Sequence, residues 1–116
     1  MPTNTKSAAE TSTTVPVACV AGAIAPEERQ CHFALIARLF REDVRERRTI
    51  AGGYGYRFEP QMLDDVARFV SNERRCCPFL RFSIELAPDD GPLWLHLVGP
   101  VGTREFLDAE LASGAP

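Results

Sequence analysis

The sequence predicts an α+β domain in which helices cover one face of a small, mostly antiparallel sheet. Two observations carry this prediction. Residues 80–98 alternate apolar and polar side chains in two runs separated by "APDDG", which is typical of a β-hairpin with one buried face. Residues 26–44 and 60–77 instead repeat their apolar side chains every three or four positions, as amphipathic helices do. The predicted order is β-α-β-α-β-β-α, folded as a two-layer sandwich.

The chain begins with a segment that is poor in large apolar side chains, "MPTNTKSAAETSTT", residues 1–14. Such a segment cannot bury enough surface to offset the entropy of ordering, so we expect a flexible tail. Residues 15–114 are predicted to form a single domain, a size that can bury a core without disulfide bridges. The domain opens with an extended segment, "VPVACVAGAI", in which Val15, Val17 and Cys19 share one side.

The first helix is predicted to begin at Pro26, because proline is favoured at the first helical position, and to run to about Val44. "AGGYGYRF" follows, where a glycine turn leads into alternating aromatic residues that predict a strand. A second helix begins at Pro60 and ends before Pro78, since proline disfavours a helical conformation in the residue before it. After the hairpin, "GTREFLDAEL" predicts a short last helix.

Charge and hydropathy exclude some classes of function. The net charge is −3, which argues against general nucleic-acid binding, because that activity usually needs a basic face. No apolar run is long enough to cross a membrane. Before the Ala23-Ile24-Ala25 run, which resembles a signal-peptidase site, Lys6 is the one basic side chain, whereas a secretion signal has a more basic start and a run richer in large apolar residues. We therefore expect a cytoplasmic protein with free thiols.

Two cysteines, Cys76 and Cys77, stand side by side in "NERRCCPFLRF" at the end of the second helix. A helical projection puts Cys77 at the centre of the apolar stripe and Cys76 at its edge. A disulfide between neighbours closes a strained ring and is disfavoured. The C-terminal end of a helix also opposes a thiolate, which argues against a disulfide catalyst.

Adjacent thiols suit a soft ion such as Hg(II), As(III) or Cu(I) better than tetrahedral zinc, which needs four ligands. Cys19, on the apolar side of the first extended segment, is a candidate third ligand. His32 is a candidate fourth, whereas Cys31 is expected to point to solvent. Two other interpretations stay open: the paired cysteines could be small apolar core residues, or the thiols of a redox sensor.

A carboxylate, Glu73, lies on the same apolar stripe one turn before Cys77. It needs a partner, because an unpaired buried charge is costly. Arg74, Arg75 and Arg81 are the candidates, which would make Glu73 a structural residue that supports the thiols. The chain offers few other catalytic groups, so an enzyme is the least favoured class of protein.

Trp94 and His96 alternate with the leucines of the second hairpin strand, so they are predicted to point away from the helices. An exposed tryptophan marks a candidate interface. With Tyr54 or Tyr56 on a neighbouring strand, it would form an apolar patch that a second copy could cover about a two-fold axis. The sequence thus predicts a homodimer through the outer face of the sheet, and an interaction module is the competing class of function.

The motif E-R-x-C-C-P-F at residues 73–79, together with "GPLWLHLVGPVGTREFL", resembles a group of small bacterial proteins. The likeness spans residues 19–111. Those proteins are uncharacterised and some are found in metal-resistance settings, so the resemblance implies metal binding without a particular activity. The adjacent cysteines also resemble the paired thiols of mercury-transport proteins, but those lie in membrane helices, of which this sequence predicts none.

Overall fold

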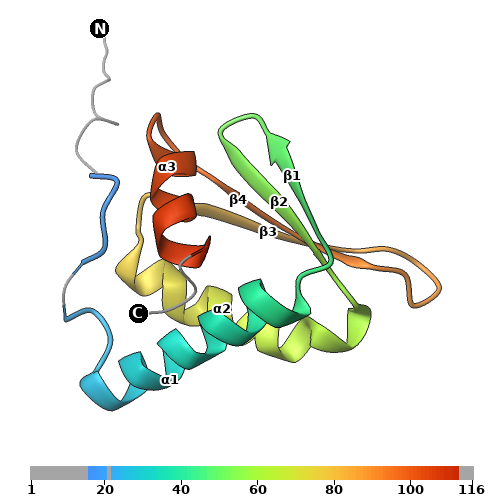
Figure 1. The fold of residues 1–116 in the computed structure, drawn as a ribbon, viewed down its shortest axis with the longest axis horizontal. Coiled ribbons are helices and arrows are strands. Elements are labelled where there is room, and N and C mark those ends of the chain that lie inside the picture. Colours follow the sequence, from blue (N-terminus) through green and yellow to red (C-terminus); the bar gives the residue numbers. More distant parts are fainter. Residues whose placement is uncertain (1–15, 21, 113–116) are drawn as a thin grey trace, which may run out of the picture.

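A computed structural model describes residues 16–20 and 22–112 of the chain, so the predicted tail at residues 1–14 lies outside the described residues. In the described part, four strands form one antiparallel sheet, and α1 and α2 lie together on one side of it (Figure 1). The α+β class is therefore confirmed. The order of the elements is α-β-β-α-β-β-α, so the predicted order is wrong in two places.

The helical elements end close to the predicted positions. They are α1 (Pro26–Arg38), α2 (Leu63–Cys76) and α3 (Thr103–Leu107), and π-helical turns at Leu39–Asp43 and Asp108–Ala112 extend the first and the last. A 3-10 turn at Pro60–Met62 leads into α2. Cys77 leaves the helical conformation, with φ −126° and ψ 70°, as expected for the residue before a proline. α2 therefore ends at Cys76, and Cys77 follows it in a non-helical conformation.

The strands are β1 (Glu46–Ile50), β2 (Gly53–Phe58), β3 (Arg81–Leu86) and β4 (Leu93–Val98), in the spatial order β1-β2-β4-β3. The predicted hairpin of β3 and β4 is confirmed, with Ser83 opposite His96. The sequence analysis missed β1, which pairs with β2. Its residues, "ERRTI", form an exposed edge strand, and they lack the apolar alternation that marks a half-buried strand.

The segment predicted as the first strand contains no strand over its described residues. Within it Gly22 takes a left-handed conformation with φ 80°, which interrupts an extended path. One backbone hydrogen bond holds the segment, from Val20 N to Cys76 O at 2.7 Å. This bond fixes the segment beside the C-terminal end of α2 and brings Cys19 close to the two neighbouring cysteines.

The inner face of the sheet supplies much of the core. Its fully buried side chains on β2 and β4 are Phe58, Leu93, Leu95 and Leu97. They pack in one core with Leu39, in the π-helical turn after α1, and with Val66 and Phe69 on α2, none of which has exposed surface. The leucine face of the hairpin therefore points to the helices, as the sequence predicts.

Trp94 lies on the outer face, half-buried and stacked on His96 with 6.3 Å between ring centres. The pairing of β2 with β4 sets Tyr54 opposite Leu97 and Tyr56 opposite Leu95, so both tyrosines share the inner face. The expectation that they extend a patch around Trp94 is wrong.

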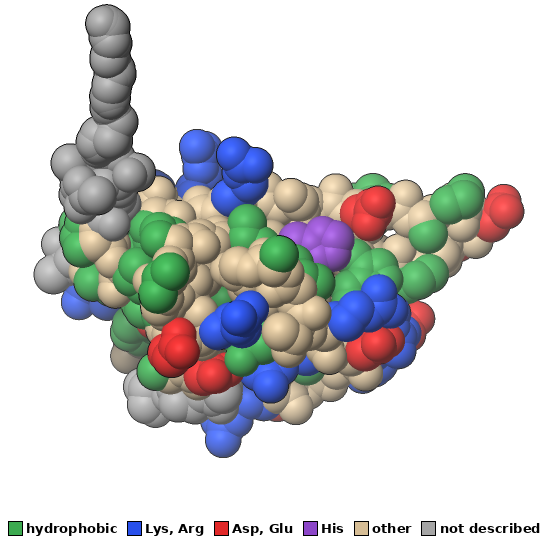
Figure 2. Space-filling view, turned by 90° about the horizontal axis from the view of Figure 1, so that it is seen from above, with side chains coloured by type: hydrophobic (Ala, Val, Ile, Leu, Met, Phe, Trp, Pro, Cys, Tyr) green, Lys and Arg blue, Asp and Glu red, His purple; other side chains and the backbone are tan. Residues whose placement is uncertain are grey.

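The outer face beside Trp94 is charged, since the guanidinium of Arg48 lies 4.2 Å from the centre of the indole ring. Arginine and acidic side chains are interspersed with apolar ones over the surface that Figure 2 shows. The homodimer through this face stays a prediction.

Candidate metal centre

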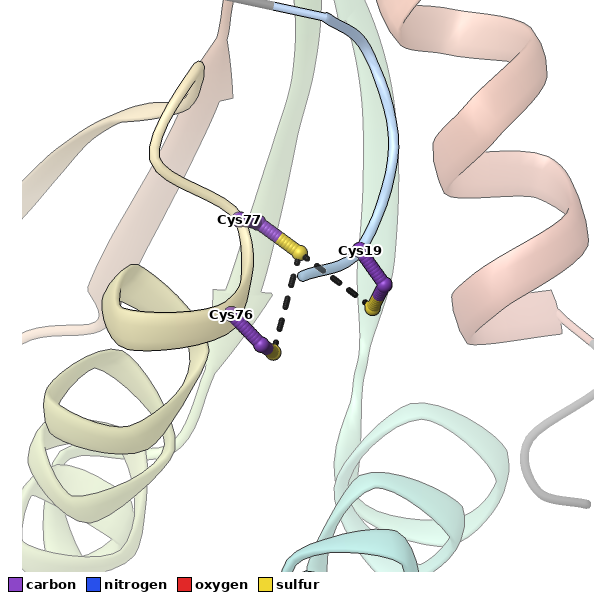
Figure 3. A group of neighbouring side chains, drawn as sticks. All are labelled: Cys19, Cys76 and Cys77. Carbon is purple, nitrogen blue, oxygen red and sulfur yellow. Dashed lines mark hydrogen bonds between the residues drawn. The ribbon is translucent and has the colours of Figure 1, made fainter. Parts of the chain in front are cut away.

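Three cysteine sulfurs meet where the extended segment touches the end of α2. Cys77 Sγ lies 3.8 Å from Cys76 Sγ and 3.9 Å from Cys19 Sγ. Figure 3 shows the three side chains converging from the loop that carries Cys19 and from the last turn of α2. Cys77 is fully buried and Cys76 nearly so, whereas Cys19 lies at the surface. The cluster is thus buried on one side and open on the other.

The spacing of the sulfurs suits a single ion. All three lie within 4.8 Å of one another. A circle through the corners of a triangle with sides of 3.8 and 3.9 Å and a third side of at most 4.8 Å has a radius of no more than about 2.5 Å. Metal–thiolate bonds are about 2.3 Å long for zinc. An ion at the centre would therefore bond all three sulfurs with small adjustments of the side chains.

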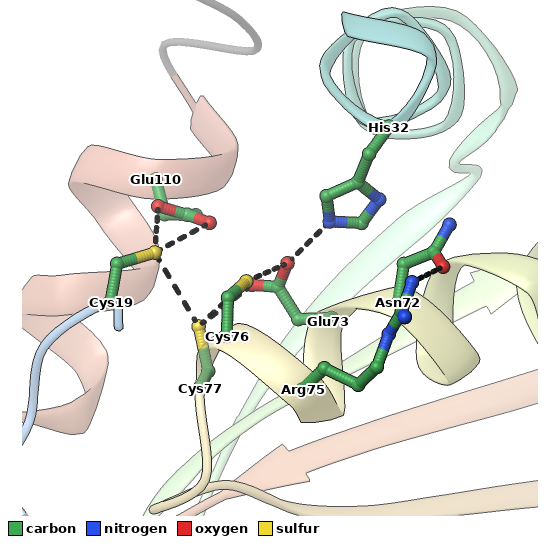
Figure 4. A network of polar contacts seen from close by, with 8 residues as sticks. All are labelled: Cys19, His32, Asn72, Glu73, Arg75, Cys76, Cys77 and Glu110. Atoms are coloured by element: carbon green, nitrogen blue, oxygen red, sulfur yellow. Dashed lines mark hydrogen bonds and ion pairs between the residues drawn. The ribbon is translucent and has the colours of Figure 1, made fainter. Parts of the chain in front are cut away.

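The buried carboxylate of Glu73 contacts the sulfurs of Cys76 and Cys77. Glu73 has no exposed surface, and its Oε2 accepts a hydrogen bond from Cys77 Sγ at 3.3 Å. Its Oε1 accepts a hydrogen bond from His32 Nε2 at 2.8 Å and lies 3.8 Å from Cys76 Sγ. His32 is itself buried on α1, where its ring stacks on Phe69 at 5.9 Å. Figure 4 shows this chain of contacts from His32 through Glu73 to the thiols.

The prediction that an arginine pairs with Glu73 is wrong, because Glu73 pairs with His32 on α1. Arg74 and Arg75 follow Glu73 on α2 by 100° and 200°, which turns both side chains to solvent. Arg75 donates instead to Glu28 on α1 at 3.1 Å, an exposed ion pair. The sequence analysis weighed His32 only as a ligand, and spacing along one helix cannot show that another helix faces it.

A second carboxylate, Glu110, was missed by the sequence analysis. Its oxygens lie 3.9 and 4.0 Å from Cys19 Sγ (Figure 4). The signal was available, because Glu110 stands three residues after Leu107 and one before Leu111, both buried. A carboxylate one helical turn after a core leucine is the same kind of anomaly that singled out Glu73.

Cys76 and His32 are held in their charged forms. The hydrogen bond with Cys77 lowers the pKa of the Cys76 thiol to about 5, with a further contribution from His32, against the opposing effect of burial. Burial alone would lower the pKa of His32, but Cys76 and Glu73 outweigh it and raise that pKa to about 9. At neutral pH the imidazolium of His32 and the thiolate of Cys76 therefore both lie beside Oε1 of Glu73.

The other two thiols are held in their neutral forms. The hydrogen bond with Cys76, burial and the charge of Glu73 together raise the pKa of Cys77 far above its usual value. Burial of the sulfur and the charge of Glu110 raise the pKa of Cys19 to about 12. Burial and the charge of Glu73 raise the pKa of Glu110 to about 8. An ion that binds all three sulfurs must displace two tightly held protons.

These shifts predict one acidic thiol. In the metal-free, reduced protein, the ultraviolet absorbance of thiolate should rise by one equivalent near pH 5, and the Cys76→Ser variant should lack this step. Cys31→Ser, which removes an exposed thiol, should retain it. A titration in which no thiolate forms below pH 8 would contradict the assignment.

Within the described residues, three overlapping groups of side chains could each hold a metal ion. They are Cys19, Cys76 and Cys77; His32, Glu73 and Cys76; and Glu73, Cys77 and Glu110. The first group unites the three predicted thiol ligands. His32 belongs to a different group, so the structure does not place it as a fourth ligand of the three sulfurs. Cys31 is exposed on α1 and joins none of these groups.

The fold and this cluster define the class: a small α+β protein with a thiol, carboxylate and imidazole cluster that could hold a metal ion. No protein family, curated protein or solved structure matches the chain. Among the described residues, no helix has the length and apolar character needed to span a membrane.

Proposed function

We propose that the protein binds a soft metal or metalloid ion, such as As(III), Hg(II) or Cu(I), through Cys19, Cys76 and Cys77. One observation carries the proposal: three sulfurs from two distant parts of the chain lie close enough together for one ion at their centre to bond all three. The resemblance to E-R-x-C-C-P-F proteins, some of which are found in metal-resistance settings, supports it. The expected cytoplasmic location and the homodimer remain predictions.

The donor set favours a three-coordinate soft ion over zinc. Zinc prefers four ligands in a tetrahedron, and the three sulfurs supply only three soft donors. Thiolates select ions that form strong bonds to sulfur. Two of the three thiols are protonated at neutral pH, so binding must supply the free energy to remove two protons. This cost lowers the affinity of every ion, and it is offset best by an ion that forms strong bonds to sulfur.

Arsenious acid suits two protonated thiols particularly well. As(OH)3 condenses with three thiols to give As(SR)3 and three molecules of water. Each thiol proton combines with one hydroxide group of arsenic and leaves as water. Where Cys76 is already a thiolate, one hydroxide ion leaves in place of one water molecule. The product carries no charge on arsenic, which suits a site that the side chains of Glu73 and Glu110 border.

The surrounding side chains would position the thiols. Glu73 holds Cys77 through Oε2 and is itself fixed by His32 through Oε1, so α1 and α2 together orient the sulfurs. The backbone bond from Val20 to Cys76 holds the third thiol nearby. Arg75 joins the two helices through Glu28 at the surface. Metal sites commonly depend on such outer partners.

A thiol redox sensor is the second candidate, favoured by the low pKa of Cys76. A disulfide would require two sulfurs to approach from 3.8 or 3.9 Å to about 2.05 Å. The other two thiols are poor nucleophiles, because they are protonated at neutral pH. The geometry therefore favours an ion that bridges the sulfurs without bringing them into contact.

Native mass spectrometry of the reduced Cys31→Ser protein tests the proposal. We expect one equivalent of As(III) or Hg(II) to bind, and Zn(II) to bind at least tenfold more weakly. Zinc binding as tight as that of arsenite would contradict the soft-ion assignment. If no ion binds, the proposal is wrong, and loss of two hydrogens after mild oxidation would then support the redox sensor.

A further inference from the structure

A cavity of about 320 Å³ adjoins the thiol cluster on the side of α1. Cys19 and Cys76 line it together with four apolar side chains, which are Val20, Ala23, Ile24 and Phe33. Gly22, Arg29 and His32 complete the lining, and the guanidinium of Arg29 donates a hydrogen bond to the carbonyl oxygen of Ile24 at 3.3 Å. Two sulfurs and two basic side chains therefore border a cavity whose other side-chain walls are hydrocarbon.

Apolar walls do not contribute to the binding of an ion that carries no organic group. Hydrocarbon side chains neither coordinate an ion nor replace its water. Two of the wall residues are also unusual in being apolar and exposed, since Val20 and Phe33 keep 47% and 37% of their surface accessible. Exposed apolar side chains around a concave site indicate an apolar ligand. An apolar cavity of about 150 Å³ can hold benzene, so this one has room for a ring or a short alkyl group.

We infer that the preferred ligand is a soft metal or metalloid that carries an apolar organic group, such as a trivalent arylarsenical or an organomercurial. This inference rests on the proposed function and specifies its ligand class. The thiols hold the metal or metalloid, and the organic group fills the cavity that Cys19 and Cys76 border. Because both sulfurs border the cavity, the organic group of a metal or metalloid atom bonded to either of them can lie in the apolar space.

The chemistry balances without an oxidant. Phenylarsonous acid, C6H5As(OH)2, condenses with two thiols: two As–O bonds break, two As–S bonds form, and two molecules of water carry away the thiol protons. Arsenic stays trivalent and its bond to carbon stays intact. Two thiols are sufficient for this ligand, whereas arsenite engages all three.

The test compares phenylarsonous acid with arsenite on variants that fill the cavity, all in the Cys31→Ser background. Ala23→Leu and Phe33→Trp enlarge two wall residues without changing a thiol or the residue whose backbone holds Cys19 beside α2. Ala34→Leu is the matched control, because Ala34 is exposed on α1 and is not part of the cavity lining. Dissociation constants are measured by calorimetry for both ligands, and circular dichroism checks that each variant is folded.

Both filling variants should weaken phenylarsonous acid at least tenfold and change arsenite binding less than threefold, and the control should alter neither. Phenylarsonous acid that binds the filled variants as tightly as the parent would overturn the inference, and unchanged arsenite binding would leave the proposed function intact. Equal weakening of both ligands would also overturn it, because the cavity would then serve only to position Cys19. A parent protein that binds phenylarsonous acid but not arsenite would contradict the bare-ion function and uphold the organic ligand.

Discussion

Replacing Glu73 with alanine should lower the free energy of unfolding by about 3 kcal/mol, the lower end of the range for a broken buried ion pair. The carboxylate has no exposed surface, and its removal leaves His32 buried without its partner. A larger loss is not expected, because imidazole, unlike guanidinium, can give up its proton when the opposing charge is gone. Urea denaturation of the metal-free protein at pH 7 measures the effect.

Two variants sharpen this prediction. Glu73→Gln keeps an oxygen that can accept the hydrogen bond from His32, so it should cost less, about 1 kcal/mol. Glu28→Ala removes the exposed partner of Arg75 between the same two helices and should cost about 0.5 kcal/mol or less. If Glu73→Ala costs no more than Glu28→Ala, then Glu73 is solvated and does not hold the thiols in place.

The second large effect concerns the adjacent thiols. Cys76→Ser/Cys77→Ser should weaken arsenite binding at least a hundredfold, which corresponds to about 2.8 kcal/mol. Serine retains the size of the side chain but supplies a hard oxygen in place of the soft donor. The measurement is a competition titration in the Cys31→Ser background, with circular dichroism to confirm that the variant is folded.

Cys31→Ser alone is the matched control, because it removes an exposed thiol that lies outside the cluster. It should leave arsenite affinity within about threefold of the unsubstituted protein. Equal affinity of the double serine variant and its parent would show that the adjacent cysteines are not ligands. They would then be small apolar core residues, as the structural interpretation of the sequence holds.

That structural interpretation accounts for the burial of the cysteines but not for their surroundings. Cys77 is fully buried, as a core residue would be. A purely apolar role would favour hydrocarbon neighbours, yet Oε2 of Glu73 lies 3.3 Å from Cys77 Sγ and Oε1 lies 3.8 Å from Cys76 Sγ, and His32 completes the cluster. Polar groups buried together are costly unless they serve each other or a ligand.

The hairpin and the two long helices could be predicted from the sequence because their signals are local. Leucines alternate along β4, and apolar side chains repeat at helical spacing along α2. β1 carries no such signal, since it is an exposed edge strand of charged residues. The segment around Cys19 alternates like a strand, but it makes its backbone contact with the end of α2 and not with the sheet.

The site was predictable in part for the same reason. The position of Cys77 and Glu73 on one helical stripe follows from counting residues along α2. The partnership of Glu73 with His32 depends on how α1 packs against α2, which the periodicity of each helix alone does not determine. Glu110 reaches the sulfurs only because the π-helical turn after α3 packs beside the extended segment.

X-ray absorption at the arsenic edge tests the central claim most directly, because it counts the atoms bonded to the metalloid. The reduced Cys31→Ser protein, loaded with one equivalent of arsenite, should show three sulfur neighbours at one distance and no oxygen. The same sample with Cys19→Ser should show two sulfurs and one oxygen. An arsenic atom with fewer than three sulfur neighbours in the Cys31→Ser protein would contradict a three-thiol site.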